Sequence, residues 1–317
     1  MSTDPQLTIL VPAYRAAATL SATLQSVFAP LKLSENMSSP EVIVVDDGSP
    51  DAAELKRICE DFPAVRLVAL PHNLGKLAAV NAGARSSHGD VVMILDADDT
   101  LVPDWPAVMR RILEEWPASS PICYSACRNQ AGRPTVADPA YRGFLSFADL
   151  LNERNAGEYL PLVRGEVLRR SGYIPIPGSA ACEAVSYLSF AEQEGSFWVS
   201  PEVLRIYHEA RADSLSSSWG DAAKAEQMVR CYETIFSRFS DRYAALAPRV
   251  WRSKRLRLAV YLMLAGRPGA WRMWRQAAAL SVWKESLGSL VMCAVGRRWT
   301  VRLVAWLKQR GWVRRYG

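Results

Sequence analysis

The chain has 317 residues, half of them hydrophobic, which is enough for one large globular domain or two modest ones. Its first residues lack the basic start and long apolar run of a secretory signal, and its six cysteines form no CxxC pair, so we expect a cytoplasmic protein with reduced thiols and no zinc site. Residues 249–317 hold 16 Lys and Arg against one acid, Glu285, whereas the first 248 residues hold 22 basic and 31 acidic residues. The sequence therefore predicts an acidic globular part followed by a basic part of net charge +15.

The first hundred residues alternate apolar strands with helices. We expect strands at 7–14, 41–49, 65–70 and 91–99, and helices at 16–28, 51–62 and 76–87. Each strand is almost entirely apolar until its last residues. This pattern is typical of a parallel sheet that is covered by helices on both faces.

The second half of the chain is mostly helical by pattern. We expect helices at 105–116, 147–153, 163–174 (ending at Gly172) and 183–195, a strand at 197–208, and helices throughout from Trp219 onward. These patterns divide the chain into an α/β part, residues 1–218, and an all-helical part, residues 219–317.

Polar and acidic residues follow three of the predicted strands where each strand ends, at 12–14, 46–49 and 96–99. Ligands collect at the carboxyl ends of parallel strands, so we expect these residues to line one acidic crevice. Asp96 and Asp98 suit a hard cation such as Mg²⁺ or Mn²⁺, which a protein usually binds through one or two carboxylates together with substrate phosphates. The alternative is an acidic turn in which Asp98, Asp99 or Thr100 caps the next helix.

The second acidic strand end has a different chemistry. Asp46 and Asp47 would repel a phosphate, but they can accept hydrogen bonds from a base N–H or from ribose hydroxyls. A turn in which the side chains of Asp47 and Ser49 bond to nearby backbone is the alternative, and it explains Asp46 less well.

Three stretches together resemble the opening of family 2 glycosyltransferases with the GT-A fold. They are LTILVPAYRAAATLSATLQSV, EVIVVDDGSPD and HNLGKLAAVNAGARSSHGDVVMILDADD, in the same order and spacing over about residues 7–105. The resemblance implies a Rossmann-like, mostly parallel sheet flanked by helices, with a nucleotide-sugar-binding half at 1–104 and an acceptor-side half at 105–218. It also implies an inverting, metal-dependent transfer from a nucleotide diphosphate donor, with UDP as the expected nucleotide.

The resemblance also assigns site residues. Asp46 would contact the base, Asp96 the ribose and the metal, and Asp98 would be the direct ligand of Mn²⁺ or Mg²⁺. Arg205 and His208 lie in a segment similar to one that follows the catalytic region in the family, and either would reach the diphosphate or the metal. The donor-binding set is Pro12, Ala13, Tyr14, Asp46, Asp47, Lys76, Asp96, Ala97, Asp98 and Arg205, and the metal set is Asp98, Asp96 and His208.

The catalytic base is expected at Glu183. The family commonly has a Glu-Asp pair at the start of a helix, followed by an aromatic residue. Aligning Tyr187 with that aromatic places Cys182 and Glu183 where the pair is usual, so this chain departs from the pattern. The alternative is that Glu183 is a first-turn acid favoured by the helix dipole.

The sequence favours addition of single sugars, and the resemblance implies transfer to a glycan or lipid-linked glycan in bacterial cell-surface polysaccharide or lipopolysaccharide synthesis. The QxxRW signature of processive synthases is absent. A sugar-phosphate nucleotidyltransferase is the alternative enzyme, although LVPAYRAAATL lacks the glycine-rich loop that would hold a triphosphate. A catalytically inactive sugar-nucleotide-binding or membrane scaffold protein is the non-enzymatic alternative.

The basic part contains seven of the eleven tryptophans and alternates Arg with Trp and Leu at helical spacing. Interfacial helices have this composition, because indole suits the headgroup layer and Arg pairs with anionic lipid. We therefore expect residues 249–317 to hold the protein peripherally on the inner face of the cytoplasmic membrane. Packing on the catalytic domain or on another subunit is the alternative. Nothing in the first 248 residues supports a nucleic-acid partner.

Overall fold

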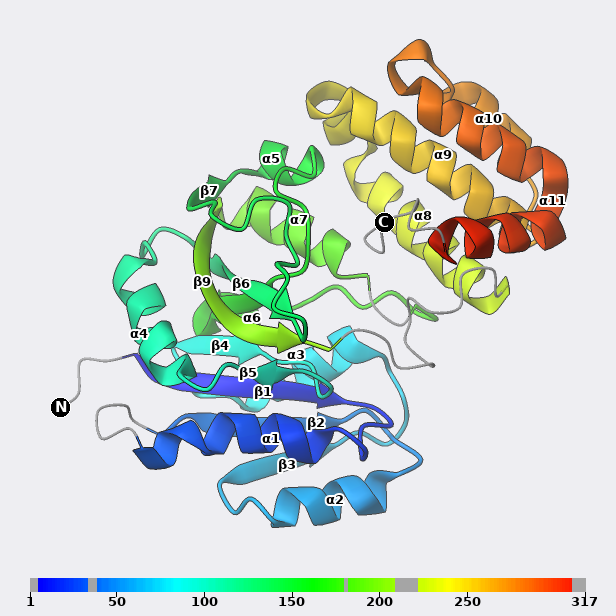
Figure 1. Ribbon diagram of the computed structural model, residues 1–317. Coiled ribbons are helices and arrows are strands. Elements are labelled where there is room, and N and C mark those ends of the chain that lie inside the picture. Colours follow the sequence, from blue (N-terminus) through cyan, green and yellow to red (C-terminus); the bar gives the residue numbers. More distant parts are fainter. Residues whose placement is uncertain (1–4, 34–38, 180–181, 209–221, 310–317) are drawn as a thin grey trace. The chain divides into compact units, whose positions relative to one another are not determined.

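The computed structural model describes residues 5–33, 39–179, 182–208 and 222–309 (Figure 1). The predicted boundary between residues 218 and 219 lies outside the described residues. The chain divides into two compact units. The first is Met1–Leu150, Arg154–Pro175 and Ser186–Glu209, and the second is Leu151–Glu153, Ile176–Val185 and Ala210–Gly317.

The four strands predicted in the first hundred residues form one parallel half of a sheet. They are β1 (Leu7–Ala13), β2 (Glu41–Asp46), β3 (Val65–Ala69) and β4 (Val91–Ile94), in the order β3-β2-β1-β4. All seven residues of β1 are buried, because strands lie on both sides of it and helices cover both faces. The register pairs Ala13 with Asp46, so the carboxyl ends of β1 and β2 lie side by side.

The other half of the sheet makes it mixed, which corrects the expectation of a mostly parallel sheet. Here β8 (Leu160–Arg164) runs antiparallel to β4 and to β6 (Ile122–Asn129), which pairs in parallel with β9 (Phe197–Tyr207). Two short strands, β5 (Thr100–Leu101) and β7 (Gly143–Leu145), run antiparallel to β9. Of these, only β9 was predicted, because Ser and Cys interrupt the apolar pattern of β6 and β8 merges in sequence with the next helix.

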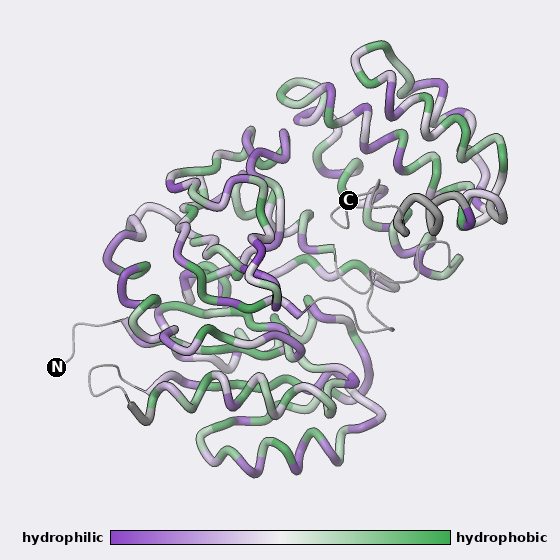
Figure 2. Tube along the Cα trace, in the orientation of Figure 1, coloured by the Kyte–Doolittle hydropathy of each residue, from purple (hydrophilic) through white to green (hydrophobic). Residues whose placement is uncertain are grey.

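Helices cover both faces of the sheet, as the sequence predicted (Figure 1). On one face, α1 (Leu20–Phe28), α2 (Ala52–Glu60) and α4 (Trp105–Glu115) pack with Ile9 and Val11; on the other, α3 (Lys76–Ser86), α6 (Gly165–Ser171) and part of α7 (Glu183–Gln193) pack with Leu10. Neighbouring residues of β1 therefore serve opposite faces. The strands that carry these residues are the hydrophobic centre of the unit (Figure 2). The shorter elements are η1 (Pro30–Leu33) and α5 (Phe147–Leu151).

From residue 222 onward the described residues of the second unit are mostly helical, which agrees with the prediction for the part after Trp219. Its main elements are α8 (Ala222–Leu246), α9 (Pro248–Leu264), α10 (Ala270–Ala277), the short η2 (Leu280–Val282) and α11 (Trp283–Gln309). Val229 and Tyr232 of α8 pack against Leu258 and Leu262 of α9. The last helix is broken at Gly296, where φ is 74°.

No single described helix combines the length and hydropathy of a membrane span, for which about 20 largely apolar residues are needed. One pair of helices, Ala270–Ala277 and Leu280–Gly296, meets the length and composition criteria jointly, but it is bent by 108°.

Glu41 ties the start of β2 to its neighbours. Its carboxylate accepts hydrogen bonds from the Thr8 hydroxyl at 2.6 Å and the His88 N–H at 2.9 Å, and it pairs with Arg66 at 2.7 Å. Burial opposes ionisation, but these donors lower the pKa of Glu41 from its ordinary value of 4.5 to about 2.

We expect Glu41→Gln to lower the free energy of unfolding by about 1–2 kcal/mol at pH 7, because water screens part of the charge that its donors stabilise. Because the folded-state pKa lies below the unfolded one, this stabilisation is complete above about pH 4.5 and is lost as the pH falls towards 2. Urea unfolding between pH 7 and pH 3 measures the difference. Glu60→Gln is the control, since Glu60 is 64% exposed and pairs with Lys56 on a helix surface. A difference that does not shrink in acid would contradict the assignment.

Candidate active site at the carboxyl end of the sheet

The turn that follows β4 carries the acidic residues. Leu95 is buried, and Asp96, Ala97, Asp98 and Asp99 follow before β5 begins at Thr100. Thr23 of α1 holds this turn, because its hydroxyl lies 3.0 Å from the Ala97 carbonyl and 2.8 Å from the Asp99 carbonyl. The next helix, α4, has Asp104 at its N-cap, so the alternative of Asp98, Asp99 or Thr100 as a helix cap is wrong.

Arg205 of β9 is the charged centre of the site. The guanidinium is 3% exposed, and its Nη1 lies 3.1 Å from Asp99 Oδ2 and 3.4 Å from Asp96 Oδ2. Lys76, the first residue of α3, reaches Asp96 Oδ1 at 2.6 Å. Burial opposes ionisation of Asp96, but the charges of Lys76 and Arg205 hold its pKa below the ordinary value. Both oxygens of Asp96 therefore face cations.

Asp99 has an unusual environment for a carboxylate. It is 1% exposed; burial and the charges of Asp96 and Asp98 raise its pKa to about 7, although Arg205 opposes the shift. Its Oδ1 accepts the His208 N–H at 2.8 Å, so Asp99 fixes the residue that follows β9. Its Oδ2 is buried and has no hydrogen-bond partner in the part of the chain that the structure describes, although Arg205 is close enough for an ion pair.

His208 brings an imidazole to the same acidic turn. Its Nδ1 lies 3.8 Å from Asp99 Oδ1, and this nitrogen is buried without a hydrogen-bond partner among the described residues. Asp98 is half-buried in the same turn. Carboxylate oxygens and an imidazole nitrogen are donors that Mn²⁺ accepts, so the chemistry of these residues fits such a cation. Within the described residues, no three His, Cys, Asp or Glu side chains form a group that could hold a metal by themselves.

Asp46 and Asp47 have separate roles at the end of β2. The side chain of Asp46 accepts the Ser49 N–H at 2.9 Å, so the expected local turn is made by Asp46 rather than by Asp47. Asp47 instead holds the loop before Lys76, because its two oxygens accept the N–H groups of Leu74 and Gly75, each at 2.8 Å. Burial raises the pKa of Asp47, and these two hydrogen bonds oppose the shift.

The residue between these strand-end aspartates and the loop must be a glycine, because there is no room for a side chain. Gly48 has a φ of +64°, and a Cβ there would lie 2.4 Å from the backbone carbonyl carbon of His72. The loop that leads to Lys76 thus packs directly on the end of β2.

The residues that follow β1 provide a surface beside this loop. Pro12 and Ala13 are buried within β1, whereas Tyr14 is 43% exposed. The Arg15 guanidinium lies 5.5 Å from the centre of the Tyr14 ring, and the Arg15 N–H donates to the Ser49 hydroxyl at 3.1 Å. The first two strand ends are therefore hydrogen-bonded to each other.

Glu183 belongs to the other compact unit of the chain. It is half-buried and begins α7, as predicted. With Ile176–Val185 it belongs to the second unit, whereas Asp96–Asp99 and Arg205 belong to the first. The other predicted residues, from Pro12 to His208, all lie in the first unit.

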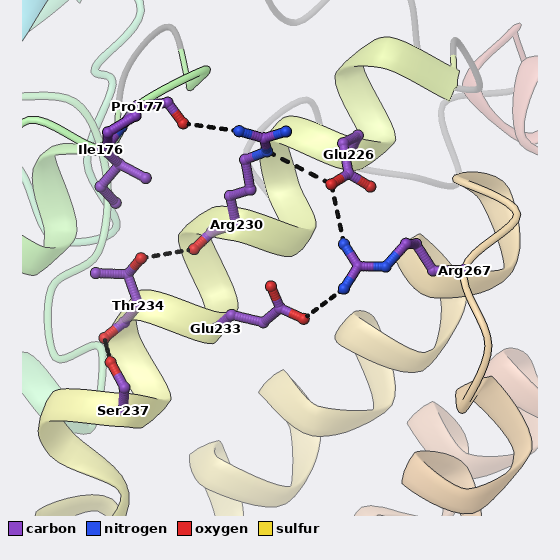
Figure 3. A pocket seen from close by; sticks show the side chains of 8 residues that line it. All are labelled: Ile176, Pro177, Glu226, Arg230, Glu233, Thr234, Ser237 and Arg267. Carbon is purple, nitrogen blue, oxygen red and sulfur yellow. Dashed lines mark hydrogen bonds and ion pairs between the residues drawn. The ribbon is translucent and has the colours of Figure 1, made fainter.

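The second unit has an open groove of its own, with a volume of about 510 Å³. Figure 3 shows the Glu226 carboxylate between the guanidinium groups of Arg230 and Arg267, at 3.4 and 2.9 Å. Arg267 also pairs with Glu233 at 3.3 Å. None of the predicted site residues lines this groove, and its charges are paired with one another.

Comparison with known proteins finds a family similarity in the first half of the chain. Residues 8–158 match the model of "Glycosyl transferase family 2". This segment, just under half of the chain, is similar to glycosyl transferase family 2. The match confirms the predicted resemblance and identifies the segment as a glycosyltransferase domain.

A curated relative extends this finding. The succinoglycan biosynthesis protein ExoO of Rhizobium meliloti (strain 1021) is 37% identical over 110 residues, which cover 35% of this chain and 29% of ExoO. The chain spans between about a sixth and a half of the length of the curated relatives it matches.

Solved structures confirm the GT-A-like fold. S. aureus TarS, residues 1–349 in complex with UDP-GlcNAc, has a TM-score of 0.55 at 15% identity, covering 90% of this chain and 79% of that one. The mannosyltransferase PcManGT from Pyrobaculum calidifontis, in complex with GDP-Man and Mn²⁺, has a TM-score of 0.52 at 21% identity, covering 94% and 88%. Identities this low carry the fold alone.

Sequence reasoning missed several residues that build the site. Thr23, Cys127 and Glu158 were not singled out: Thr23 holds the acidic turn, while the Cys127 sulfur and the Glu158 carboxylate lie 3.2 and 3.7 Å from Arg205. Asp99 was predicted to line the acidic crevice or to cap the next helix, but its pairing with Arg205 was not predicted. Its position directly after Asp98 was the single signal available, since the pairing with Arg205 joins residues more than a hundred positions apart.

We expect Arg205→Met to lower the free energy of unfolding by about 3–5 kcal/mol, because it leaves Asp99 buried without its cation and leaves Asp96 with Lys76 alone. Adding Asp99→Asn should restore part of the loss, since the two residues interact directly. Chemical denaturation of the two single variants and the double variant measures this. Arg111→Met is the control; its guanidinium is 48% exposed, so removing its pair with Glu202 should cost less than about 1 kcal/mol. Equal losses in the two arginine variants would contradict the central role of Arg205.

Proposed function

We propose that this protein transfers a sugar from a nucleotide diphosphate donor to a hydroxyl of a glycan or lipid-linked glycan, with inversion at the anomeric carbon. The observation that carries the proposal is the cluster of Asp96, Lys76 and Arg205 beside Asp98, at the carboxyl end of a glycosyltransferase sheet. Two cations held by one carboxylate give a site that attracts a diphosphate, while the neighbouring acids attract a divalent cation.

The nucleoside would lie over the ends of β1 and β2. Tyr14 offers an exposed ring for stacking, and Asp46 offers the remaining carboxylate oxygen to a base N–H. Pro12 and Ala13 would form the floor, and Ala97 would line the donor side of the turn. Asp47 would act through the loop that it fixes, because each of its oxygens already accepts a backbone N–H.

The divalent cation, Mn²⁺ or Mg²⁺, would be held by Asp98 and His208. When bound, it supplies positive charge to the departing diphosphate. Since fewer than three grouped protein ligands are present among the described residues, diphosphate oxygens and water would complete its coordination. Asp96, whose oxygens face Lys76 and Arg205, would orient these two cations and contact the ribose, so its contribution to the metal would be secondary.

Glu183 would act as the base. The acceptor hydroxyl would give its proton to the Glu183 carboxylate as its oxygen attacks the anomeric carbon, and the bond from that carbon to the diphosphate oxygen would break on the opposite face. Lys76 and Arg205 would stabilise the charge that develops on the leaving diphosphate. The name of the relative ExoO supports polysaccharide assembly as the pathway in which this addition of a sugar takes place.

We expect UDP with Mn²⁺ to raise the apparent stability of the protein, by about 2.7 kcal/mol when the ligand is at 100 times its Kd. Asp98→Asn should abolish the part of the shift that depends on Mn²⁺. A thermal-shift series with UDP and GDP, with and without the metal, measures both. Asp104→Asn is the matched control, because Asp104 is exposed and makes no side-chain cap bond on α4. Failure of both nucleotides to stabilise the wild-type protein would refute the proposed donor.

We expect Glu183→Gln to reduce sugar transfer by about a hundredfold or more while leaving the nucleotide-induced thermal shift intact, because the base acts on the acceptor and not on the donor. Hydrolysis or transfer assayed with a panel of nucleotide sugars gives the rate. Glu192→Gln, on an exposed position of the same helix, is the control. An unchanged rate in Glu183→Gln would place the base elsewhere.

A further inference from the structure

The last helix of the second unit exposes a row of large apolar side chains. Trp283, Leu287, Val291 and Val295 of α11, which we call the outer stripe, are 58, 55, 41 and 40% exposed. Their spacing of four residues places them along one side of the helix. Leu280, just before α11, is 91% exposed and Trp299, beyond the break at Gly296, is 61% exposed. Several large apolar groups thus meet solvent on consecutive turns.

The opposite side of the same helix is small and polar, yet buried. Ser286, Ser289 and Cys293 are only 9, 6 and 7% exposed. The indole N–H of Trp274 lies 3.1 Å from both the Ser286 carbonyl and the Ser289 hydroxyl, which explains why serines occupy these inward positions. A helix of a globular protein normally buries its apolar face and exposes its polar one. This segment does the reverse, so its outer stripe needs a cover from outside the unit.

The surroundings of the stripe are cationic. Lys284 lies 5.6 Å from the ring centre of Trp283, and Arg302 lies 5.3 Å from that of Trp299. Arg272 and Arg275 are exposed on α10, together with Trp271, which is 48% exposed. Between residues 249 and 317 the single acid is Glu285. Tryptophan beside cations, next to an aliphatic row, is the composition of helices that lie in the headgroup layer.

We propose that the outer stripe docks on the surface of an anionic lipid bilayer, with α11 lying in the interface rather than crossing it. Charge complementarity selects this occupant: an anionic surface neutralises the cations around the stripe, whereas a second copy of the chain would bring two equally basic faces together. The bend of 108° between α10 and the following helix also favours a surface orientation over a straight span. This inference does not depend on the proposed sugar transfer. If both hold, the transfer takes place at the bilayer surface.

Vesicle binding by the full chain tests the proposal. We expect sedimentation with phosphatidylcholine vesicles that contain phosphatidylglycerol, and weak binding to phosphatidylcholine alone or at high salt. The triple variant Trp283→Ser, Leu287→Ser, Val291→Ser should bind at least about thirtyfold more weakly, and Leu287→Ser alone about threefold more weakly. Leu246→Ser is the matched control, because Leu246 is 47% exposed but lies on α8, and it should bind as the wild type does.

Three results would overturn the proposal. Wild-type protein that stays in solution with anionic vesicles would do so, as would a triple variant that is folded by circular dichroism and still binds fully. A dimer that forms without lipid, is dissociated by Leu287→Ser and ignores vesicles would assign the stripe to a second copy. If the triple variant unfolds, Leu287→Ser with its expected threefold loss decides in its place, since that side chain is 55% exposed. Because no nucleotide enters this assay, its failure leaves the proposed donor site untouched, and a failed nucleotide shift leaves this result untouched.

Discussion

The buried guanidinium of Arg205 is the constraint on which the acidic end of the sheet depends. It is 3% exposed and faces Asp96, Asp99 and Glu158 while it donates to the Cys127 sulfur and the Tyr159 carbonyl. A charge this deeply buried is tolerated only with partners of opposite charge. The turn after β4, the end of β6 and the segment before β8 must therefore all be in place around one residue of β9. The need to neutralise Arg205 therefore brings together segments from several parts of the first unit to form the proposed donor site.

The aspartates around Arg205 have different environments although they are chemically identical. Asp96 is ionised between two cations, with its pKa lowered, whereas Asp99 has a raised pKa because it is almost completely buried among other carboxylates. Asp98 is half-buried in the same turn. Position relative to Arg205 and to solvent thus sets three different roles within four residues. In the same way, Asp46 and Asp47 differ because one bonds to its own turn and the other holds the loop before Lys76.

The sequence allowed accurate prediction of the first hundred residues because the information there is local. Each strand is largely apolar and has an acid or a proline at or just after its end, and each helix between strands has one apolar face. The second half of the sheet was missed for the opposite reason. Ser125 is buried in β6 because its hydroxyl donates to the Glu202 carbonyl, a contact across 77 positions that no local pattern reports. Arg205 was singled out only by resemblance, and its partners Cys127 and Glu158 carried no signal at all.

The two units bury different kinds of polar side chain. In the first, acids and cations enter the interior and neutralise one another, which leaves the sheet end charged and suited to small anionic ligands. In the second, serines lie on the side of α11 that faces the core of the unit, where their oxygens accept hydrogen bonds from the Trp274 indole. Tryptophan, leucine and valine then lie on the exposed side of the helix. Exposing these apolar side chains to water is unfavourable, so this arrangement costs free energy unless another apolar surface covers them. The two proposals fit together on this basis: the polar sheet end would hold a dissolved nucleotide sugar, and the exposed helix would bring it to an acceptor at a lipid surface.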